Sequence, residues 1–332
     1  MKAIRIREAG GPEVLELSEY PQPVPGEGQV LIRVAATALN RADILQREGK
    51  YPPPSGESEI PGLEVSGWIE ALGPGCHRFE PGEAVCALLA GGGYATYVTV
   101  HETLVMPVPA GMSLVAAAAI PEAFITAWQA LTRLGQVEAG ETVLIHAGGS
   151  GVGTAAIQLA AALGAIPIVT ASPGKHALCL SLGAAQALDY KAGPFVEACL
   201  AYTDRRGINL AIDCIGGPYL SQHLEVLAPD GRLVLLAAMG GTRAEADLRQ
   251  ILRKRLTLMG STLRNRSLAY KAELVASFGA FAAPLWADGT LRPVLDQVMP
   301  WTAVAAAHTR LESNLSAGKI VLTVSADPPG SA

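Results

Sequence analysis

A glycine-rich loop near the middle of the chain has the residue types and spacing needed to bind a phosphate group. The loop reads Ala147-Gly148-Gly149-Ser150-Gly151-Val152-Gly153. It follows the apolar run Thr142–His146 and precedes the small, apolar stretch Thr154–Leu163. Glycines let backbone amides approach a diphosphate, and the amino end of a helix adds free N–H groups and a positive dipole. The pattern therefore predicts a dinucleotide-binding loop between a strand and a helix.

The segment after the next apolar run favours NADPH over NADH. An NAD enzyme usually places Asp or Glu at the end of the second strand, where it binds the ribose 2′-hydroxyl. Here Ile166–Thr170 is followed by Ala171-Ser172-Pro173-Gly174-Lys175, without a carboxylate. Ser172 and Lys175 can instead bind a 2′-phosphate through charge-assisted hydrogen bonds. The alternative is that Lys175 only begins a solvent-exposed helix.

The elements that must hold this loop change character along the chain. The first third contains short, β-branched runs bounded by Gly and Pro, which predict a compact barrel-like β domain. From about residue 121, strands alternate with helix-like stretches, which is typical of a doubly wound parallel sheet in an α/β protein. The expected strands are Thr142–His146, Ile166–Thr170, Ala187–Tyr190, Leu210–Ile215, Arg232–Ala238 and Leu256–Leu263. A helix over Leu268–Trp286 and a strand over Lys319–Val324 follow, and we expect them to pack back on the first domain.

Composition and charge argue against several classes of partner. Half of the residues are hydrophobic and 17% are charged, as in a well-buried α/β enzyme. The net charge of −5 argues against nucleic acid or an anionic membrane as the main partner, because either would need clustered Lys and Arg. The densest basic cluster, Arg249 to Arg255, is interpreted as the solvated face of a helix. Residues 142–174 lack charged side chains, but their glycines and Pro167 favour a buried strand–turn–helix–strand over a membrane span.

The cysteines and histidines show no spacing typical of a metal site. The five cysteines include no Cys-x2-Cys pair, and the amino terminus lacks the apolar core of a signal peptide. We therefore expect reduced thiols in a cytoplasmic protein. The histidines suggest no metal cluster, and His101, His223 and His308 are interpreted as surface residues.

Several segments resemble the quinone oxidoreductase (zeta-crystallin-like) branch of the medium-chain dehydrogenases/reductases. The segments are Gly140–Ala147, Ser150–Ala160 and Asp213-Cys214-Ile215-Gly216-Gly217. Within that branch, the chain is most similar to the tumour-suppressor-inducible subfamily of animals. That resemblance rests on Ala38–Asp43, Ala119–Ala123, Leu188–Lys191 and Gly318–Leu322.

The resemblance implies a domain organisation and a metal-free reaction. It implies a GroES-like catalytic domain over residues 1–122, a Rossmann NADPH-binding domain over 123–264, a return segment over 265–332 on the catalytic domain, and a cleft between the domains. Zinc alcohol dehydrogenases of the same superfamily have Cys where this chain has Asn40, and His where it has Leu63 before Glu64. Neither residue can replace those zinc ligands, and the structural-zinc cysteine lobe is absent too. We therefore expect NADPH-dependent hydride transfer to a quinone without zinc.

The resemblance also implies a set of site residues. Asn40 and Tyr51 would line the nicotinamide and acceptor pocket, and the Tyr51 phenol would donate a hydrogen bond to the acceptor oxygen. The alternatives are a packing residue for Tyr51 and a turn-capping amide for Asn40. Further cofactor contacts are expected at Thr126, Tyr190, Ile215, Gly216, Met239, Gly240, Leu263, Arg264 and Lys319.

Two other functions stay open beside reduction of a small-molecule quinone. The first is NADPH-dependent reduction of an enone, a 2-alkenal or an enoyl thioester, which uses the same hydride donor but needs protonation at carbon. The second is a non-catalytic NADPH- or RNA-binding role of the crystallin type, and the acidic balance argues against RNA. Because Leu256–Leu263 would form an exposed apolar sheet edge in a monomer, we also expect a homodimer.

Overall fold

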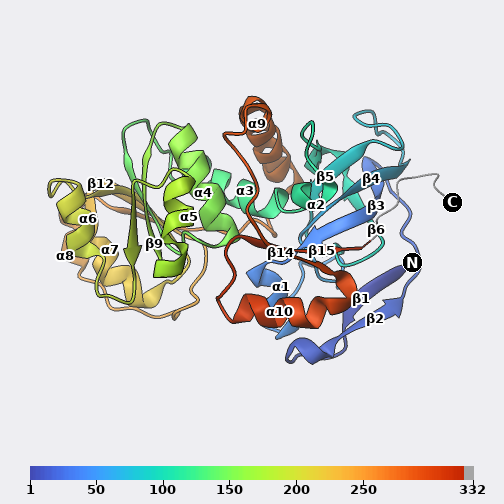
Figure 1. Cartoon of the computed structure of the whole chain (residues 1–332), viewed down its shortest axis with the longest axis horizontal. Helices are drawn as coiled ribbons and strands as arrows, with labels where there is room; N and C mark the ends of the chain where they lie inside the picture. Colours follow the sequence, from blue (N-terminus) through green and yellow to red (C-terminus); the bar gives the residue numbers. More distant parts are fainter. Residues whose placement is uncertain (325–332) are drawn as a thin grey trace. The chain divides into compact units, whose positions relative to one another are not determined.

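The computed structural model describes residues 1–324, which form two compact units. Unit 1 comprises Met1–Ile125 and the chain from Leu263 onward, and unit 2 comprises Thr126–Thr262. In Figure 1, unit 2 runs from green to orange, and unit 1 combines the blue amino-terminal part with the red carboxyl-terminal part. Unit 1 is therefore built from two segments that are far apart in the sequence.

Unit 2 is a six-stranded parallel sheet with helices between its strands. The strand order is β10-β9-β8-β11-β12-β13, and every neighbouring pair is parallel. The strands are β8 (Thr142–Ile145), β9 (Ile166–Ala171), β10 (Gln186–Asp189), β11 (Ile208–Asp213), β12 (Leu227–Leu235) and β13 (Thr257–Gly260). The chain builds outward from β8 in one direction and then, from β11, in the other. The carboxyl ends of β8 and β11 therefore meet at the point where the strand order reverses, which is where ligands bind in sheets of this kind.

The helices of unit 2 divide between the two faces of this sheet. They are α4 (Gly151–Ala162), α5 (His176–Ser181), α6 (Val196–Tyr202), α7 (Leu220–Val226) and α8 (Leu248–Lys254). Right-handed crossovers put α4 and α5 on one face and α6 to α8 on the other. The second face is closed by a buried cluster in which Cys199 of α6 and Leu224 of α7 pack on Leu144 and Leu233 of the sheet.

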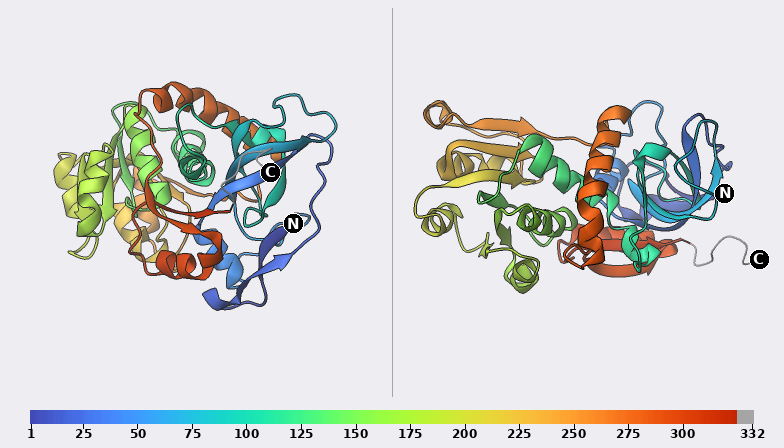
Figure 2. Two further views of the ribbon diagram at one scale, coloured as in Figure 1. Left: turned by 45° about the vertical axis from the view of Figure 1, so that its right-hand side comes forward. Right: turned by 90° about the horizontal axis from the view of Figure 1, so that it is seen from above.

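Unit 1 contains a seven-stranded sheet that the carboxyl-terminal chain completes. Its path is β14-β15-β3-β4-β5-β7, and β6 also pairs with β3. These strands are β3 (Gln29–Ala38), β4 (Glu64–Leu72), β5 (Ala84–Leu88), β6 (Tyr97–His101), β7 (Val105–Pro107), β14 (Leu295–Pro300) and β15 (Lys319–Thr323). β15 pairs antiparallel with β3, so the end of the chain lies in register against an early strand, and Figure 2 shows these two segments side by side.

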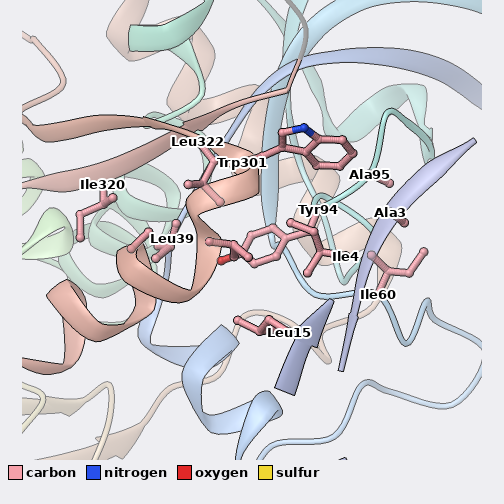
Figure 3. Packing of buried hydrophobic residues seen from close by; sticks show 12 residues of the cluster. Ala3, Ile4, Leu15, Leu39, Ile60, Tyr94, Ala95, Trp301, Ile320 and Leu322 are labelled. Atoms are coloured by element: carbon pink, nitrogen blue, oxygen red, sulfur yellow. The ribbon is translucent and has the colours of Figure 1, made fainter. Parts of the chain in front are cut away.

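The remaining elements of unit 1 cover this sheet. β1 (Lys2–Ile6) and β2 (Leu15–Glu19) form a separate hairpin pair. The helices are α1 (Arg41–Arg47), α2 (Leu114–Ala117), the first part of α3 (Pro121–Trp128), α9 (Leu268–Ala287) and α10 (Val304–Glu312). Figure 3 shows that Ile4 and Leu15 of the hairpin pack with Tyr94 and with Trp301 and Leu322 of the returning chain. Apolar burial thus ties the two segments of unit 1 together.

Most expected elements form, with differences at their ends. All six predicted strands of the parallel sheet are present, and the basic cluster lies on the exposed helix α8. Helix α4 begins at Gly151 rather than Thr154, because Ser150 accepts a hydrogen bond from the N–H of Gly153 and starts the helix earlier. None of the helices in residues 1–324 combines the length and apolar character needed to cross a membrane.

The prediction of surface positions for His223 and His308 is wrong, since both side chains are fully buried. The His308 ring lies between two polar partners, the Tyr94 hydroxyl at 3.2 Å and the Arg47 guanidinium at 3.4 Å. The His223 ring packs edge-on against His146 and lies close to Asp213. Polar sequence neighbours suggested exposure, but distant parts of the chain supply the partners that make burial possible.

Candidate functional site

The glycine loop of unit 2 has the backbone geometry of an anion-binding site. Ala147 takes a left-handed backbone conformation, with φ 53°, at the turn from β8 into the loop. Ser150 Oγ accepts from the N–H of Gly153 at 3.0 Å and so caps α4. Within residues 1–324, the N–H groups of Gly151 and Val152 have no acceptor. These free amides at the positive end of the helix fit a diphosphate.

Two glycines of the loop lie in close contact with neighbouring atoms. A Cβ on Gly153 would stand 2.3 Å from the carbonyl oxygen of Ala147. The first turn of α4 therefore lies so close to the loop that only glycine fits at this position. A Cβ on Gly149 would stand 2.6 Å from Cδ of Lys175. The Lys175 side chain therefore lies across the loop. It follows the turn that Ser172 begins after β9, so the two residues expected at a 2′-phosphate lie beside the loop expected at the diphosphate.

Two further predicted cofactor segments meet at the carboxyl edge of the same sheet. The N–H of Gly240 donates to the carbonyl of Ile215 at 2.8 Å, and Gly216 has a positive φ of 84° in the turn after β11. Met239, which precedes Gly240, is 49% exposed. Tyr190, just after β10, is also exposed. The structure thus brings the Ile215-Gly216 and Met239-Gly240 pairs together beyond the ends of β11 and β12.

Asn40 in unit 1 belongs to a buried polar cluster. Its Nδ2 donates to Glu64 Oε1 at 2.9 Å, and its Oδ1 accepts from Lys319 Nζ at 2.7 Å. The same Lys319 Nζ lies 2.6 Å from Glu64 Oε1. Glu64 is fully buried and Lys319 is 5% exposed. Asn40 is also the N-cap residue of α1, where its backbone N–H donates to Asp43 Oδ2, so the turn-capping alternative stays open.

The residues around Asn40 do not fit a zinc ion. The amide oxygen of Asn40, its only good ligand atom, already accepts from the Lys319 ammonium group. That ammonium group would repel a metal cation at short range. Leu63, at the second expected ligand position, is a buried aliphatic side chain. Neither position offers the thiolate or imidazole that zinc prefers.

Tyr51 lies against the guanidinium of Arg264. Arg264 Cζ lies 5.4 Å from the centre of the Tyr51 ring, and Nη1 donates to the Tyr51 carbonyl at 3.3 Å. Its other nitrogens donate to the carbonyl of Ala90 at 2.6 Å and to Gln46 Oε1 at 2.7 Å. These bonds fix the Tyr51 segment, so Arg264 acts here as a support. The predicted cofactor contacts of Arg264 and Lys319 stay predictions.

The Tyr51 phenol is available as a donor. The side chain is half-buried, and its hydroxyl has no hydrogen-bond partner in the described part of the chain. Burial raises the pKa of Tyr51, and the nearby Arg264 charge only partly offsets this effect. The phenol therefore stays protonated at neutral pH and can donate to an acceptor oxygen.

Sequence reasoning missed two buried carboxyl groups that organise the Asn40 segment. Asp43 Oδ2 accepts from the backbone N–H of Asn40 at 2.8 Å, and its Oδ1 accepts from that of Gly62 at 3.1 Å. Burial raises the pKa of Asp43 to about 6. Glu64 was considered only as the neighbour of Leu63. The Asn-x-x-Asp spacing from Asn40 to Asp43 is a helix-start signal that points to Asp43.

Two predicted contacts have little around them that tests their role. Thr126 is half-buried on α3, and Leu263 is 6% exposed at the start of the returning chain. Burial alone does not test a cofactor role at either position, so both stay predictions.

Comparison with known proteins connects both units to described families. Residues 26–110 match the alcohol dehydrogenase GroES-like domain, and residues 151–278 match the zinc-binding dehydrogenase family. A quinone oxidoreductase of Lama guanicoe is 34% identical over 329 residues, which are 97% of each chain.

Solved structures resemble this chain over nearly its whole length. A mycobacterial protein in complex with NADPH has a TM-score of 0.88 at 30% identity, covering 98% of this chain and 100% of its own. An NAD-dependent alcohol dehydrogenase has a TM-score of 0.87 at 32% identity with the same coverage. The CurK enoyl reductase has a TM-score of 0.86 at 28% identity, covering 97% of this chain and 98% of its own. The resemblance thus extends to an NADPH complex, an NAD-dependent alcohol dehydrogenase and an enoyl reductase.

Proposed function

The chain belongs to the medium-chain dehydrogenase/reductase family as a homologue of its quinone oxidoreductases, and on this premise we propose that it is a zinc-free NADPH:quinone oxidoreductase. The observation that carries the proposal is the Asn40–Lys319–Glu64 cluster. It fills the expected zinc position with an amide and a buried ion pair. A reaction that needs no Lewis acid, such as hydride transfer to an electron-poor quinone, suits this arrangement.

NADPH is supported as the cofactor by the cations and amides of unit 2. The free N–H groups of Gly151 and Val152 would hold the diphosphate. Lys175, whose side chain lies over Gly149, and Ser172 would hold the 2′-phosphate. When bound, the cofactor supplies the hydride. Because one structural relative is an NAD-dependent alcohol dehydrogenase, the test compares NADPH with NADH directly.

Tyr51 would polarise the acceptor through its phenol. A quinone oxygen gains negative charge as the ring is reduced, and a hydrogen bond from a neutral phenol stabilises that charge. Arg264 keeps the Tyr51 segment in place through its backbone and ring contacts. Asn40, held by Glu64 and Lys319, would orient the reacting groups with its amide. Because the hydride supplies two electrons and one hydrogen, only one proton is needed to complete the hydroquinone, and it can come from solvent.

We also propose a cytoplasmic homodimer. β13 pairs only with β12, so the other edge of this short strand has no partner in the described chain. Pairing across a two-fold axis would cover that edge. All five cysteines are free, and four of them are buried, as suits a reducing compartment. Sedimentation at micromolar concentration tests the dimer, and a monomeric mass would contradict it.

An acceptor panel tests the proposed reaction. We expect purified protein to oxidise NADPH with 1,2-naphthoquinone and a 1,4-quinone at a higher kcat/KM than with an α,β-unsaturated aldehyde. We also expect NADPH to exceed NADH with the same quinone. Equal kcat/KM for both cofactors would contradict the NADPH assignment. Tight NADPH binding without turnover of any acceptor would favour the non-catalytic role.

Reduction of an enone or enoyl thioester is the second candidate. The resemblance to the CurK enoyl reductase favours it, because hydride transfer to an activated double bond uses the same donor. That reaction must also place a proton on carbon. A higher kcat/KM for the unsaturated aldehyde than for either quinone would establish this alternative.

A further inference from the structure

Three buried side chains with metal-binding atoms meet at the carboxyl edge of the unit 2 sheet, and the proposed reaction uses none of them. His146 follows β8, Asp213 ends β11 and His223 lies on α7. Each is at most 3% exposed. Their ligand atoms all lie within 4.8 Å of one another. Because β8 and β11 are neighbours where the strand order reverses, residues distant in the sequence come together there.

Both histidines present ring nitrogens that lack a partner. His146 Nδ1 lies 2.8 Å from Thr170 Oγ1, which orients the ring, while its Nε2 has no hydrogen-bond partner within residues 1–324. Neither ring nitrogen of His223 has one there, although Nε2 lies 3.3 Å from Asp213 Oδ2. Buried nitrogens are rarely left unpaired, because losing water without a replacement costs free energy. A histidine fixed through one nitrogen and presenting the other is the usual arrangement of a metal ligand.

The charge of Asp213 also lacks a permanent counterion. In residues 1–324, no Lys or Arg forms an ion pair with this carboxylate. His146 Nε2, which has no hydrogen-bond partner in the described residues, can present its lone pair to an ion. The cluster thus combines a buried carboxylate with two imidazoles that present ring nitrogens without partners in the described chain, which favours a cation.

We propose that His146, Asp213 and His223 bind one divalent transition-metal ion, with Zn²⁺ as the best match. Two imidazoles and a carboxylate are ligands that zinc accepts. With bonds of about 2.0–2.1 Å, ligand atoms in a tetrahedral zinc site lie roughly 3.4 Å apart. The 3.3 Å separation of His223 and Asp213 already meets this requirement, and the ligand atom of His146 lies within 4.8 Å of both.

The surroundings indicate a structural role for this ion. The rings of Phe195 and Tyr219 each lie 4.8 Å from the His146 ring, measured between centroids, and shield the cluster. Asp213 also accepts from the backbone N–H groups of Ile215 at 2.6 Å and Gly216 at 3.0 Å. A metal on the three side chains would tie β8, β11 and α7 together and hold the turn after β11.

Metal content tests the site directly. The untagged wild-type chain, expressed with added Zn²⁺ so that the site can load during folding, should retain about one Zn²⁺ after dialysis. His223→Gln should lose it, as should Asp213→Asn. His77→Gln, which changes an exposed histidine of unit 1, should retain it. Replacing Zn²⁺ with Co²⁺ should give visible d–d absorption bands in wild type and not in His223→Gln.

Thermal unfolding gives a second readout that does not depend on NADPH turnover. Removing the metal with a chelator should lower the Tm of wild type by about 2–4 °C or more and leave that of His223→Gln unchanged. Wild type without bound metal, or equal retention by His223→Gln, would overturn the proposal. A wild-type Tm that chelation does not change would assign the three side chains to a metal-free contact between His223 and Asp213 instead. None of these measurements uses a quinone or another electron acceptor. A negative result would therefore refute the metal site without refuting the proposed reaction. Asp213→Asn can fail to fold, because Asp213 also holds the turn after β11. In that case the metal content and Tm of His223→Gln test the proposal.

Discussion

The side chain of Lys175 lies across Gly149, so that a Cβ on Gly149 would stand 2.6 Å from Lys175 Cδ. A cation from the end of the second strand is therefore held beside the loop that follows the first strand. This relationship connects the two features of the sequence that favour NADPH, the glycine loop and the missing acidic residue.

Replacing Lys175 should weaken NADPH selectively. Lys175→Ala removes a charge-assisted hydrogen bond to the 2′-phosphate, so the KM for NADPH should rise about 10- to 100-fold. The KM for NADH, which lacks that phosphate, should not change. Arg253→Ala, which removes an exposed cation of the same unit, is the control. An unchanged KM for NADPH in the Lys175 variant would contradict the role of this lysine.

Two alanine substitutions in the loop should separate cofactor binding from stability. In Gly149→Ala the new methyl group meets the flexible Lys175 side chain, which can move away, so the KM for NADPH should rise while stability changes little. In Gly153→Ala the new methyl group would stand 2.3 Å from the carbonyl oxygen of Ala147, and a backbone atom cannot move away as a flexible side chain can. That variant should lose about 1–3 kcal/mol of unfolding free energy. Urea unfolding with and without NADPH measures both effects, and a fully stable Gly153→Ala would contradict the close approach.

Tyr51→Phe should slow catalysis without loss of NADPH binding. Removing a donor to a developing oxyanion should lower kcat with a quinone about 10- to 100-fold. Because burial raises the pKa of Tyr51, the wild-type rate should not decline through loss of the phenol proton below about pH 10. Steady-state rates from pH 6 to 10, with cofactor binding followed by fluorescence, check both statements. Tyr202→Phe, an exposed tyrosine on α6, is the control. Full activity of Tyr51→Phe would leave this residue as a packing group.

The Glu64–Lys319 pair should show strong coupling. Lys319→Met leaves the buried Glu64 carboxylate without its cation and should cost about 3–5 kcal/mol of stability. The double variant Glu64→Gln/Lys319→Met removes both charges and should be more stable than Lys319→Met alone. Chemical unfolding of wild type, both single variants and the double variant completes the cycle. Additive losses would contradict direct coupling across the 2.6 Å contact.

Local sequence patterns were sufficient to predict much of the fold, but only part of the candidate site. The alternation of apolar runs with helix-like stretches indicated all six strands of the parallel sheet, because a buried parallel strand must be apolar along its length. The partners of side chains were harder to predict. Asn40 and Lys319 are 279 positions apart and meet only because β15 pairs with β3. His223 and Asp213 likewise meet through strand order, which no short spacing in the sequence records.

His308 should make unit 1 sensitive to acid. Burial, with a smaller effect of Arg47, lowers its pKa to about 3, whereas an unfolded histidine has a pKa near 6.5. The folded chain thus binds fewer protons between these values, so stability is highest above about pH 6.5 and falls as the pH decreases toward 3. At pH 5 the loss from this one histidine is about 2 kcal/mol. Asp43 acts in the opposite direction, since its raised pKa of about 6 reduces stability as the pH rises from about 4 to 6.

The variant His308→Gln separates these contributions. A glutamine can still reach the Tyr94 hydroxyl, but it does not titrate. Between pH 7 and pH 5 the Tm of the variant should therefore fall by less than that of wild type, even if its Tm at pH 7 is lower. His77→Gln, an exposed site, should follow wild type. Equal pH dependence of the Tm in His308→Gln and wild type would show that this buried imidazole takes up no proton on unfolding, which would contradict its lowered pKa.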